Sequence, residues 1–377
     1  MFICRTYLES RPMSTVWPLP KVTYTPLNMT TETRPVALLT SETAWTNFGN
    51  LLNLPLVVQA EPTSNDRDLL DYLADHLPSQ TGVIYVLGQG IPLTAGKLVA
   101  NKNKLPLVVV PTAISSDEIF EPHVTLPAEG LMHRLEVGPA SEVIIDWSVI
   151  EAAPAYERAA GIVDVVAIVT ALLDWRYAAK LNRNTPEQQF SQWGAGVAAG
   201  LATQAIKSAK EIGEGKIEAL RTLVDLLMMS VQLANQLGHD RHEEGTEHYL
   251  AFSMGNQGAK FDHAEVVGPG ILFASALHGQ DPSALRDALM TSGVRLDQLR
   301  FGDVRLAIND LPNFCNNNNL PFGIGHEIDP FSERVTKALE KAGLVDQTPT
   351  AWQAVPTIVE PAAPTSDTTP LAPPSMG

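Results

Sequence analysis

Three polar side chains in the second half of the chain have the residue types needed to hold a divalent metal ion. Asp164 is a carboxylate inside the apolar segment 161–167, where an isolated buried charge is costly unless a partner compensates it. His248 follows Glu247, and His263 opens a second apolar segment. One carboxylate and two imidazoles form a ligand set for a divalent transition metal, with a coordination position left for water or substrate.

Residue type alone leaves the choice of histidines open. A single histidine on a helix is more often a core or capping residue than a ligand. His239, His242 and His278 therefore compete for the same role. His278 precedes Gly279, which suits a helix-end residue near a dipole. Its His-Gly dipeptide also makes it a rival of His263.

A glycine turn follows the apolar segment 82–87. Gly88, Gln89 and Gly90 stand where a strand would end, and Lys97 would lie roughly two turns into the helix that follows. Glycines at such a place let backbone N–H groups approach a phosphate, and the helix N-terminus adds a favourable dipole. The alternative interpretation is an ordinary tight connection between a strand and a helix.

Hydroxyls and a carboxylate follow the next apolar segment, 105–110. Thr112, Ser115 and Asp117 lie just beyond it. Ligands of open parallel sheets bind at the carboxyl ends of strands, so these side chains are candidates for a binding site. The alternative is that Ser115, Ser116 or Asp117 caps a helix.

Alternation of short apolar segments with amphipathic ones predicts a parallel sheet covered on both faces. We expect strands at 35–40, 56–60, 82–87, 105–110 and near 141–146, with a helix over 66–76. Helices follow at 156–181, 188–210, 217–237, 246–254 and 330–342. Pro269 between two glycines predicts that 263–278 is two helical pieces or a kinked helix, and Asn316 to Asn319 are expected in a loop.

This pattern divides the chain into four parts. Residues 1–33 form an extension or an edge element, 34–150 an α/β nucleotide-binding domain, and 151–346 an all-α domain for metal and substrate. Residues 347–377 are rich in Pro and Thr, and we expect a disordered tail because they cannot bury enough apolar surface.

Composition limits the class of partner. The 377 residues carry a net charge of -16, which argues against nucleic acid and anionic membranes. The two cysteines, Cys4 and Cys315, do not suggest a disulfide framework. We see no signal peptide and no apolar stretch long enough to cross a membrane, so a cytoplasmic protein is expected. The oligomeric state stays open, a homo-oligomer included.

Taken in order, the motifs resemble those of the superfamily of dehydroquinate synthase, iron-containing alcohol dehydrogenases and glycerol dehydrogenase. The likeness is strongest to its sn-glycerol-1-phosphate dehydrogenase branch. The motifs that carry it are Gly88-Gln89-Gly90 with Thr94 and Lys97, Pro111-Thr112 with Ser115 and Asp117, Val163-Asp164, Asp174-Trp175-Arg176, Arg241 to His248, and His263 to Gly268.

The resemblance implies a dehydroquinate synthase-like fold with its active site between an α/β and a helical domain. It implies Asp164, His248 and His263 as metal ligands and Asp117 beside the substrate or the nicotinamide. Residues lining NAD or NADP would be Gly88, Gln89, Gly90, Lys97, Thr112 and Ser115. The metal would be Zn²⁺, with Fe or Ni as alternatives. Asp174 is expected to be structural, paired with Arg176 or a helix end.

By the same resemblance the chain would be an oxidoreductase that interconverts a polyol, a polyol phosphate or another sugar-derived substrate and its ketone. Two alternatives stay open: a cyclase or lyase that uses NAD transiently, and a non-catalytic relative. His242 and Glu244 stand where the branch has Pro and Ser, and the acidic pair Glu243 and Glu244 beside the expected substrate site would repel a phosphate. This favours an uncharged polyol or an amine-bearing substrate, unless both side chains face solvent at a helix start.

Deleting residues 350–377 should change the melting temperature by less than about 2 °C, because a disordered segment makes few contacts. Thermal unfolding followed by circular dichroism measures this. A drop of several degrees would show that the tail packs on the body of the protein.

Overall fold

The computed structural model describes residues 16–128, 131–259 and 261–345. A six-stranded sheet, parallel at every pairing, is ordered β1-β8-β5-β4-β2-β3. Its strands are β1 (Lys21–Tyr24), β2 (Val36–Thr40), β3 (Leu56–Ala60), β4 (Val83–Leu87), β5 (Leu107–Val110) and β8 (Glu142–Ile145).

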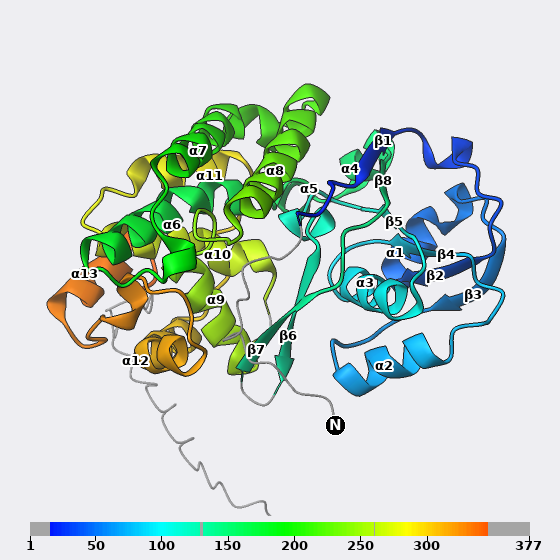
Figure 1. Cartoon of the computed structure of the whole chain (residues 1–377). Coiled ribbons are helices and arrows are strands. Elements are labelled where there is room, and N and C mark those ends of the chain that lie inside the picture. The colour runs from blue at the N-terminus through cyan, green and yellow to red at the C-terminus, as the bar shows by residue number, and fades with distance from the viewer. Residues whose placement is uncertain (1–15, 129–130, 260, 346–377) are drawn as a thin grey trace, which may run out of the picture. The chain divides into compact units, whose positions relative to one another are not determined.

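The central strands are apolar throughout because both faces of the sheet are covered. Every residue of β2, β4 and β5 is buried, whereas the edge strands β1 and β3 keep exposed positions. Helix α3 (Ile91–Asn103) packs on β2, β4 and β5, and α2 (Arg67–Asp75) packs on α3. The short helices α1 (Glu42–Phe48) and α4 (Trp147–Ala152) complete this part of the chain (Figure 1).

The second half of the described chain is helical, and α6 (Ile162–Lys180) is its central element. Helix α6 contacts α7, α8, α9, α10 and α11, which explains why it is apolar on almost every side. The other helices are α5 (Ala155–Arg158), α7 (Gln192–Gly213), α8 (Ile217–Leu237), α9 (Thr246–Asn256), α10 (His263–Leu277), α11 (Ser283–Thr291), α12 (Phe301–Asn317) and α13 (Glu333–Ala342).

An antiparallel hairpin, β6 (His123–Ala128) and β7 (Leu131–Glu136), lies between the two groups of elements (Figure 1). Strand β6 contacts α3 and strand β7 contacts α9. The single-turn helix η3 (Asp117–Ile119) precedes the hairpin and contacts α8. The hairpin therefore connects the sheet region with α9, the helix that carries His248.

The predicted fold class is confirmed, and the strands and most helices lie near the expected ranges. The predicted helix 156–181 is instead two helices, α5 and α6, separated by residues 159–161. The segment 263–278 is one helix with Pro269 inside it, so it is not two pieces, and a kink stays a prediction. Helix α12 continues through Asn317, so the predicted asparagine loop begins two residues later than expected. The hairpin, α1, α11 and α12 were not predicted.

Domain boundaries are a separate matter. Residues up to Val345 form one compact unit, and the division near residue 150 stays a prediction. The tail 347–377 lies outside the described residues, as does Cys4. Residues 21–24 of the predicted extension form the edge strand β1, while Cys315 is a buried free thiol.

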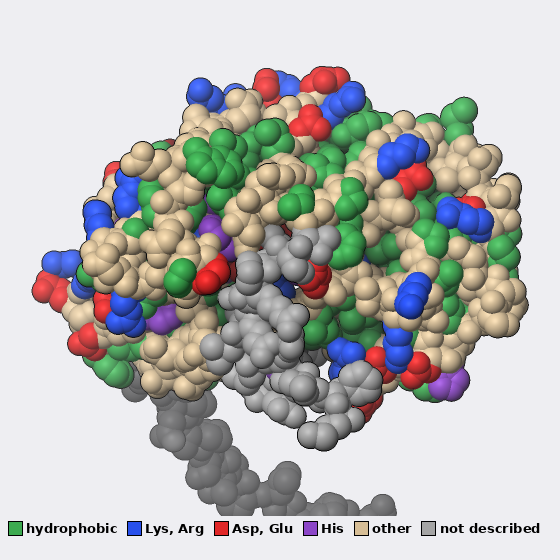
Figure 2. Space-filling model, in the orientation of Figure 1, with side chains coloured by type: hydrophobic (Ala, Val, Ile, Leu, Met, Phe, Trp, Pro, Cys, Tyr) green, Lys and Arg blue, Asp and Glu red, His purple; other side chains and the backbone are tan. Residues whose placement is uncertain are grey.

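No helix among the described residues is long and apolar enough to cross a membrane. On the face shown in Figure 2, described Lys and Arg side chains are scattered among Asp and Glu side chains and do not gather into a basic patch. This face gives no electrostatic surface of the kind that binds a nucleic-acid backbone.

Asp174 joins four elements of the helical region. Its Oδ2 accepts hydrogen bonds from the backbone N–H and the hydroxyl of Thr246, both at 2.7 Å. Its Oδ1 accepts from the N–H of Ile324 and lies 2.8 Å from Nε2 of His278. Asp174 is thus structural, as expected: it binds the first N–H of α9, the predicted helix-end alternative, and its ion-pair partner is His278 rather than Arg176.

Two glycines make room for this carboxylate. A Cβ atom added to Gly245 would lie 2.9 Å from Oδ2 of Asp174, and one added to Gly323 would lie 2.6 Å from it. Burial raises the pKa of Asp174, but the hydrogen bonds and the His278 ring outweigh burial and lower the pKa below its ordinary value.

Asp174→Asn should lower the free energy of unfolding by about 3 kcal/mol, because the substitution breaks a buried, fully bonded pair. Since the folded-state pKa is depressed, this stabilisation is complete above about pH 4 and disappears as the pH falls through the folded pKa. Denaturant titrations of the wild-type protein and the variant, above and below about pH 4, measure the difference in the free energy of unfolding. Asp287→Asn, on the exposed face of α11, is the matched control and should cost about 0.5 kcal/mol or less.

Candidate active site

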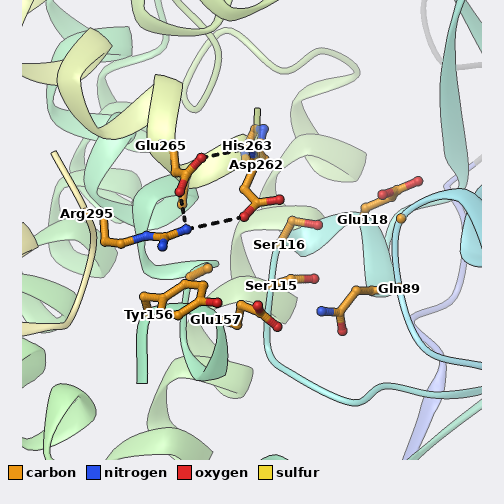
Figure 3. Close-up of a pocket in the computed structure, with 13 residues that line it drawn as sticks. Gln89, Ser115, Ser116, Glu118, Tyr156, Glu157, Asp262, His263, Glu265 and Arg295 are labelled. Carbon is orange, nitrogen blue, oxygen red and sulfur yellow. Dashed lines mark hydrogen bonds and ion pairs between the residues drawn. The ribbon is translucent and has the colours of Figure 1, made fainter. Parts of the chain in front are cut away.

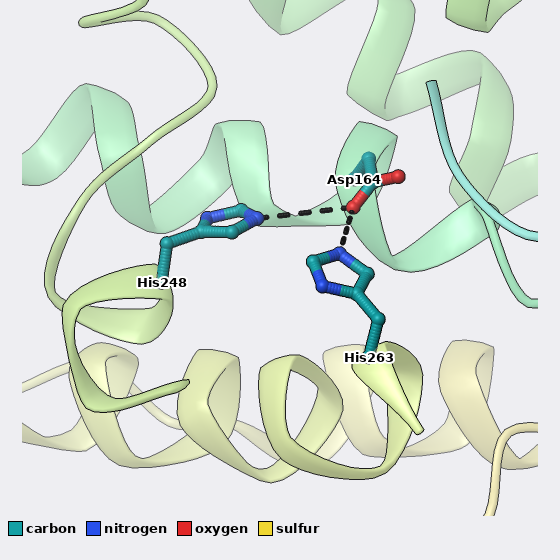
Figure 4. Close-up of side chains that lie close together, drawn as sticks. All are labelled: Asp164, His248 and His263. Carbon is teal, nitrogen blue, oxygen red and sulfur yellow. Dashed lines mark hydrogen bonds and ion pairs between the residues drawn. The ribbon is translucent and has the colours of Figure 1, made fainter. Parts of the chain in front are cut away.

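Asp164, His248 and His263 meet at one point, although they come from α6, α9 and α10 (Figure 4). Nε2 of His263 lies 2.6 Å from Oδ1 of Asp164, and Nε2 of His248 lies 3.8 Å from the same oxygen. One donor atom from each residue lies within 4.8 Å of the other two. The three side chains therefore converge as metal ligands do.

Asp164 is buried in the first turn of α6, where the helix dipole favours a negative charge. Its Oδ2 accepts a hydrogen bond of 3.1 Å from the backbone N–H of Asp117. The loop after β5 approaches closely because α6 is preceded by Gly161, whose added Cβ would lie 2.9 Å from the nitrogen of Ser116. The absence of a side chain at Gly161 thus allows the loop after β5 to contact this carboxylate.

His248 is oriented from behind by the residue that precedes it. Glu247 is fully buried; its Oε1 lies 3.2 Å from Nδ1 of His248 and accepts from the N–H of Gly245. Helices α9 and α10 approach closely, because an added Cβ on Gly270 would lie 2.9 Å from the carbonyl oxygen of Glu247. A carboxylate behind a ligating histidine fixes the ring orientation and raises its basicity.

The charges of the cluster are mutually stabilised. Burial alone raises the pKa of Asp164, but His263 and His248 more than compensate and lower the pKa below its ordinary value. Burial lowers the pKa of His248, whereas hydrogen bonds to Asp164 and Glu247 raise it to about 10. Hydrogen bonding and the attraction of opposite charges therefore hold the two imidazole rings beside the Asp164 carboxylate. Two imidazoles and one carboxylate also form a ligand set that suits a divalent metal ion.

The competing histidines lie elsewhere. His278 is paired with Asp174, His242 lies 3.1 Å from the hydroxyl of Ser230, and the ring of His239 accepts from the N–H of Arg241. Among the described residues, Asp164, His248 and His263 alone combine two histidines with a carboxylate in a metal-sized cluster.

A pocket of about 300 Å³ adjoins the cluster, with His263 in its wall (Figure 3). Gln89, Gly90 and Ser115 line one side, at the carboxyl ends of the strands. The opposite side comes from the helical region, with Tyr156, Glu157, Asp262, Glu265 and Arg295. Three of the residues predicted to line the cofactor thus share a pocket with a candidate metal ligand.

The glycine turn has the backbone that its sequence requires. Gly88 has a φ of 123° and Gly90 a φ of 60°, a region that side chains rarely adopt. Gly90 immediately precedes α3, so the helix N-terminus faces the pocket side of the turn. Gln89 folds back, and its Oε1 accepts from the N–H of Ala113 and the hydroxyl of Thr112.

Other residues predicted for the cofactor are placed differently. Lys97 is only 1% exposed, and its ammonium donates to the carbonyl oxygens of Glu118 and His123. Thr112 contacts Gln89, and neither it nor Lys97 nor Gly88 lines the described pocket. Lys97 therefore holds the segment between η3 and β6 in place.

Sequence reasoning missed Tyr156 and Arg295. The guanidinium of Arg295 lies over the ring of Tyr156, 3.7 Å from its centroid, and pairs with Glu265. These residues carry no local motif: Arg295 lies in the segment between α11 and α12, and its contacts with Tyr156 on α5 and Glu265 on α10 place it at the pocket. A sequence signal for them is absent.

Glu243 and Glu244 do not form a solvent-facing pair. Glu243 is 3% exposed, and Glu244 is half-buried with its carboxylate 3.5 Å from Arg134. Arg241 is turned to the carbonyl oxygen of Phe322, 2.8 Å away. Burial, and next the charge of Asp164, raise the pKa of Asp117; burial, opposed by Arg134, raises that of Glu121 to about 8. These carboxylates are thus crowded together.

Known proteins resemble this chain in sequence. The family model of iron-containing alcohol dehydrogenases matches residues 30–154. A glycerol-1-phosphate dehydrogenase [NAD(P)+] of Thermoplasma acidophilum is 26% identical over 72% of this chain and 76% of its own length. That of Methanothermobacter thermautotrophicus is 31% identical over 55% of this chain and 59% of its own. The chain is thus similar to iron-containing alcohol dehydrogenases in its first half and to glycerol-1-phosphate dehydrogenases over most of its length.

Solved structures of other proteins share the fold. Glycerol dehydrogenase from Schizosaccharomyces pombe superposes with a TM-score of 0.61 at 16% identity, covering 86% of this chain and 89% of that one. The iron-containing alcohol dehydrogenase from Corynebacterium glutamicum gives 0.60 at 14% identity, over 86% and 95%. Both the predicted fold and the predicted likeness to the glycerol-1-phosphate dehydrogenase branch are confirmed.

His248→Ala should lower divalent-metal affinity by at least about 100-fold, because even loss of a side chain that orients a ligand costs 10- to 100-fold. Zn²⁺ titration calorimetry and elemental analysis after dialysis measure this, and circular dichroism should show an unchanged fold. His76→Ala, an exposed histidine at the end of α2, is the control and should retain wild-type affinity. Equal metal content in both variants would rule out His248 as a ligand.

Proposed function

We propose that this protein is a metal-dependent oxidoreductase that interconverts a polyol or polyol phosphate and its ketone with NAD or NADP. The observation that carries the proposal is the shared position of His263. It contacts Asp164 in the candidate metal cluster and lines the pocket that contains the glycine turn. A substrate at the cluster would therefore lie beside a cofactor in the pocket.

Asp164, His248 and His263 would hold the metal, and Zn²⁺ is the first choice because catalytic zinc is commonly bound by histidine and carboxylate ligands. Fe or Ni is the alternative. When bound, such a metal supplies Lewis-acid chemistry that lowers the pKa of a substrate hydroxyl or polarises the corresponding ketone. Glu247 holds the His248 ring through Nδ1, which leaves Nε2 directed at Asp164.

Gln89, Gly90 and Ser115 would bind the dinucleotide, with the N-terminus of α3 directed at its phosphates. The cofactor itself supplies hydride-transfer chemistry. Asp117 would orient the substrate: its backbone already reaches Asp164, and its carboxylate lies beside Glu121 and Glu243. Lys97 would act indirectly, by fixing the backbone between η3 and β6.

Metal-loaded protein should accumulate reduced nicotinamide when NAD⁺ or NADP⁺ and a polyol are supplied, as followed by absorbance. Asp164→Asn should lower kcat/KM by at least about 100-fold, since Lewis-acid assistance contributes several kcal/mol. Asp287→Asn on α11 is the control and should keep wild-type activity.

The outcome separates the alternatives. Consumption of substrate without net reduction of the cofactor would indicate the cyclase or lyase. Absence of turnover together with absence of metal and nucleotide binding would indicate the non-catalytic relative.

A further inference from the structure

A second carboxylate cluster lies next to the candidate metal centre. It consists of Asp117 in η3, Glu121 before β6 and Glu243 before α9, with one oxygen of each within 4.8 Å of the others. The backbone N–H of Asp117 donates to Asp164, so the two clusters are neighbours. Unlike the metal cluster, this one contains no histidine.

Few cations lie around the cluster, and most of them also bind other groups. Nε2 of His242 lies 3.3 Å from Oε2 of Glu243. Arg134 lies 3.1 Å from Glu121, but the same guanidinium also binds Asp240 at 2.5 Å and Glu244 at 3.5 Å. Lys97 donates to two backbone carbonyls and to neither Asp117 nor Glu243. Among the described residues, the cluster and its acidic neighbours Asp240 and Glu244 therefore outnumber the cations that contact them.

Glu243 provides a second, independent observation, because one of its buried oxygen atoms lacks a hydrogen-bond donor among the described residues. Its side chain is almost completely buried, and Oε2 accepts a hydrogen bond from the hydroxyl of Ser230 at 2.5 Å. Its other oxygen, Oε1, is buried without a hydrogen-bond partner among the described residues. Leaving a carboxylate oxygen buried and unpaired is costly, so its place beside Asp117 and Glu121 indicates a donor that arrives with a ligand.

Two members of the cluster, Asp117 and Glu121, are only half-buried, whereas Glu243 is buried. The carboxylate of Asp117 accepts no hydrogen bond from the part of the chain that the structure describes. Since the backbone of Asp117 is bonded to Asp164, a molecule at the metal centre would have this carboxylate within reach. A compact substrate could therefore touch both clusters.

The geometry fits an ammonium group. An ammonium nitrogen has three N–H donors, and acceptors about 2.8 Å from it along those bonds stand about 4.6 Å apart. Three carboxylate oxygens within 4.8 Å of one another meet this requirement. A Ca²⁺ or Mg²⁺ ion would need about six oxygen ligands, whereas the neighbouring Ser230 and Arg134 groups are donors.

We propose that Asp117, Glu121 and Glu243 form a subsite for a protonated amine, and that the substrate is an amino alcohol or amino polyol whose hydroxyl lies at the metal centre. This inference rests on the proposed oxidoreductase function and names its substrate class. The same carboxylates repel a phosphate ester, since their charge has the same sign as the phosphate.

Three substrates of one carbon skeleton test the assignment: 3-amino-1,2-propanediol, glycerol and sn-glycerol 1-phosphate. Each is supplied to the metal-loaded wild-type protein with NAD⁺ or NADP⁺ at about pH 7, where an alkyl amine is protonated. The amine should have a kcat/KM at least about 10-fold above glycerol, as expected for one charged hydrogen-bonded contact. The phosphate ester should be the poorest substrate.

Glu243→Gln should lower the ratio of kcat/KM for the amine to that for glycerol by about 10-fold or more, because it removes a charged acceptor. Retained glycerol turnover, melting temperature and bound Zn²⁺ would show that fold and metal site are intact. Glu244→Gln is the matched control: the same charge change on a residue beside Arg134 should alter the ratio by less than about threefold. If Glu243→Gln does not fold, Glu121→Gln replaces it.

Several results would overturn the inference. These are equal kcat/KM for the amine and glycerol, preference for the phosphate ester, or an unchanged ratio in both cluster variants. A second equivalent of bound Mn²⁺ that Glu243→Gln removes would instead identify a metal site. Failure of the proposed function is a different result, because it would abolish nicotinamide reduction with all three substrates.

Discussion

A buried carboxylate at the start of α6 organises the centre of this protein. Asp164 is 5% exposed and surrounded by apolar side chains, so its charge is tolerated only with close partners. Those partners come from three directions: an N–H group from the sheet edge, one imidazole from α9 and another from α10. The packing of sheet, hairpin and helices must satisfy all three together, and the glycines at 161 and 270 allow the necessary close approaches.

Helix α6 contains a second buried carboxylate with a similar arrangement but a different outcome. Asp174 pairs with His278 at the far end of α10, just as Asp164 pairs with His263 at its beginning. Backbone N–H groups and a hydroxyl saturate Asp174, which leaves no room for a ligand. At Asp164 the partners are two imidazoles, and the His263 side chain is 39% exposed. The surroundings of each carboxylate, and not its residue type, therefore decide whether it forms a structural pair or a candidate ligand site.

This difference marks how far the sequence could lead. The apolar strands and the long helices follow from local periodicity, and the family motifs select His263 over His278 although both precede small residues. Strand β6 of the hairpin contains Pro127, which cannot donate a ladder hydrogen bond, so its pattern does not predict a strand. Helix α12 includes Pro312 and ends in asparagines, which favour a loop by propensity, but burial of its apolar face decides the outcome. Lys97 was expected at a phosphate, and only the structure shows that backbone carbonyls take its ammonium.

The contacts that complete the site also determine when it can exist during folding. Asp164 and His263 are separated by 99 residues, Asp174 and His278 by 104, and Asp174 and Ile324 by 150. Such contacts carry a large loop-closure cost, so they form only when most of the chain is already in place. The ligand-binding site is therefore not assembled in an unfolded or partly folded chain. Any ion or substrate that binds here therefore adds its binding free energy to the stability of the whole fold.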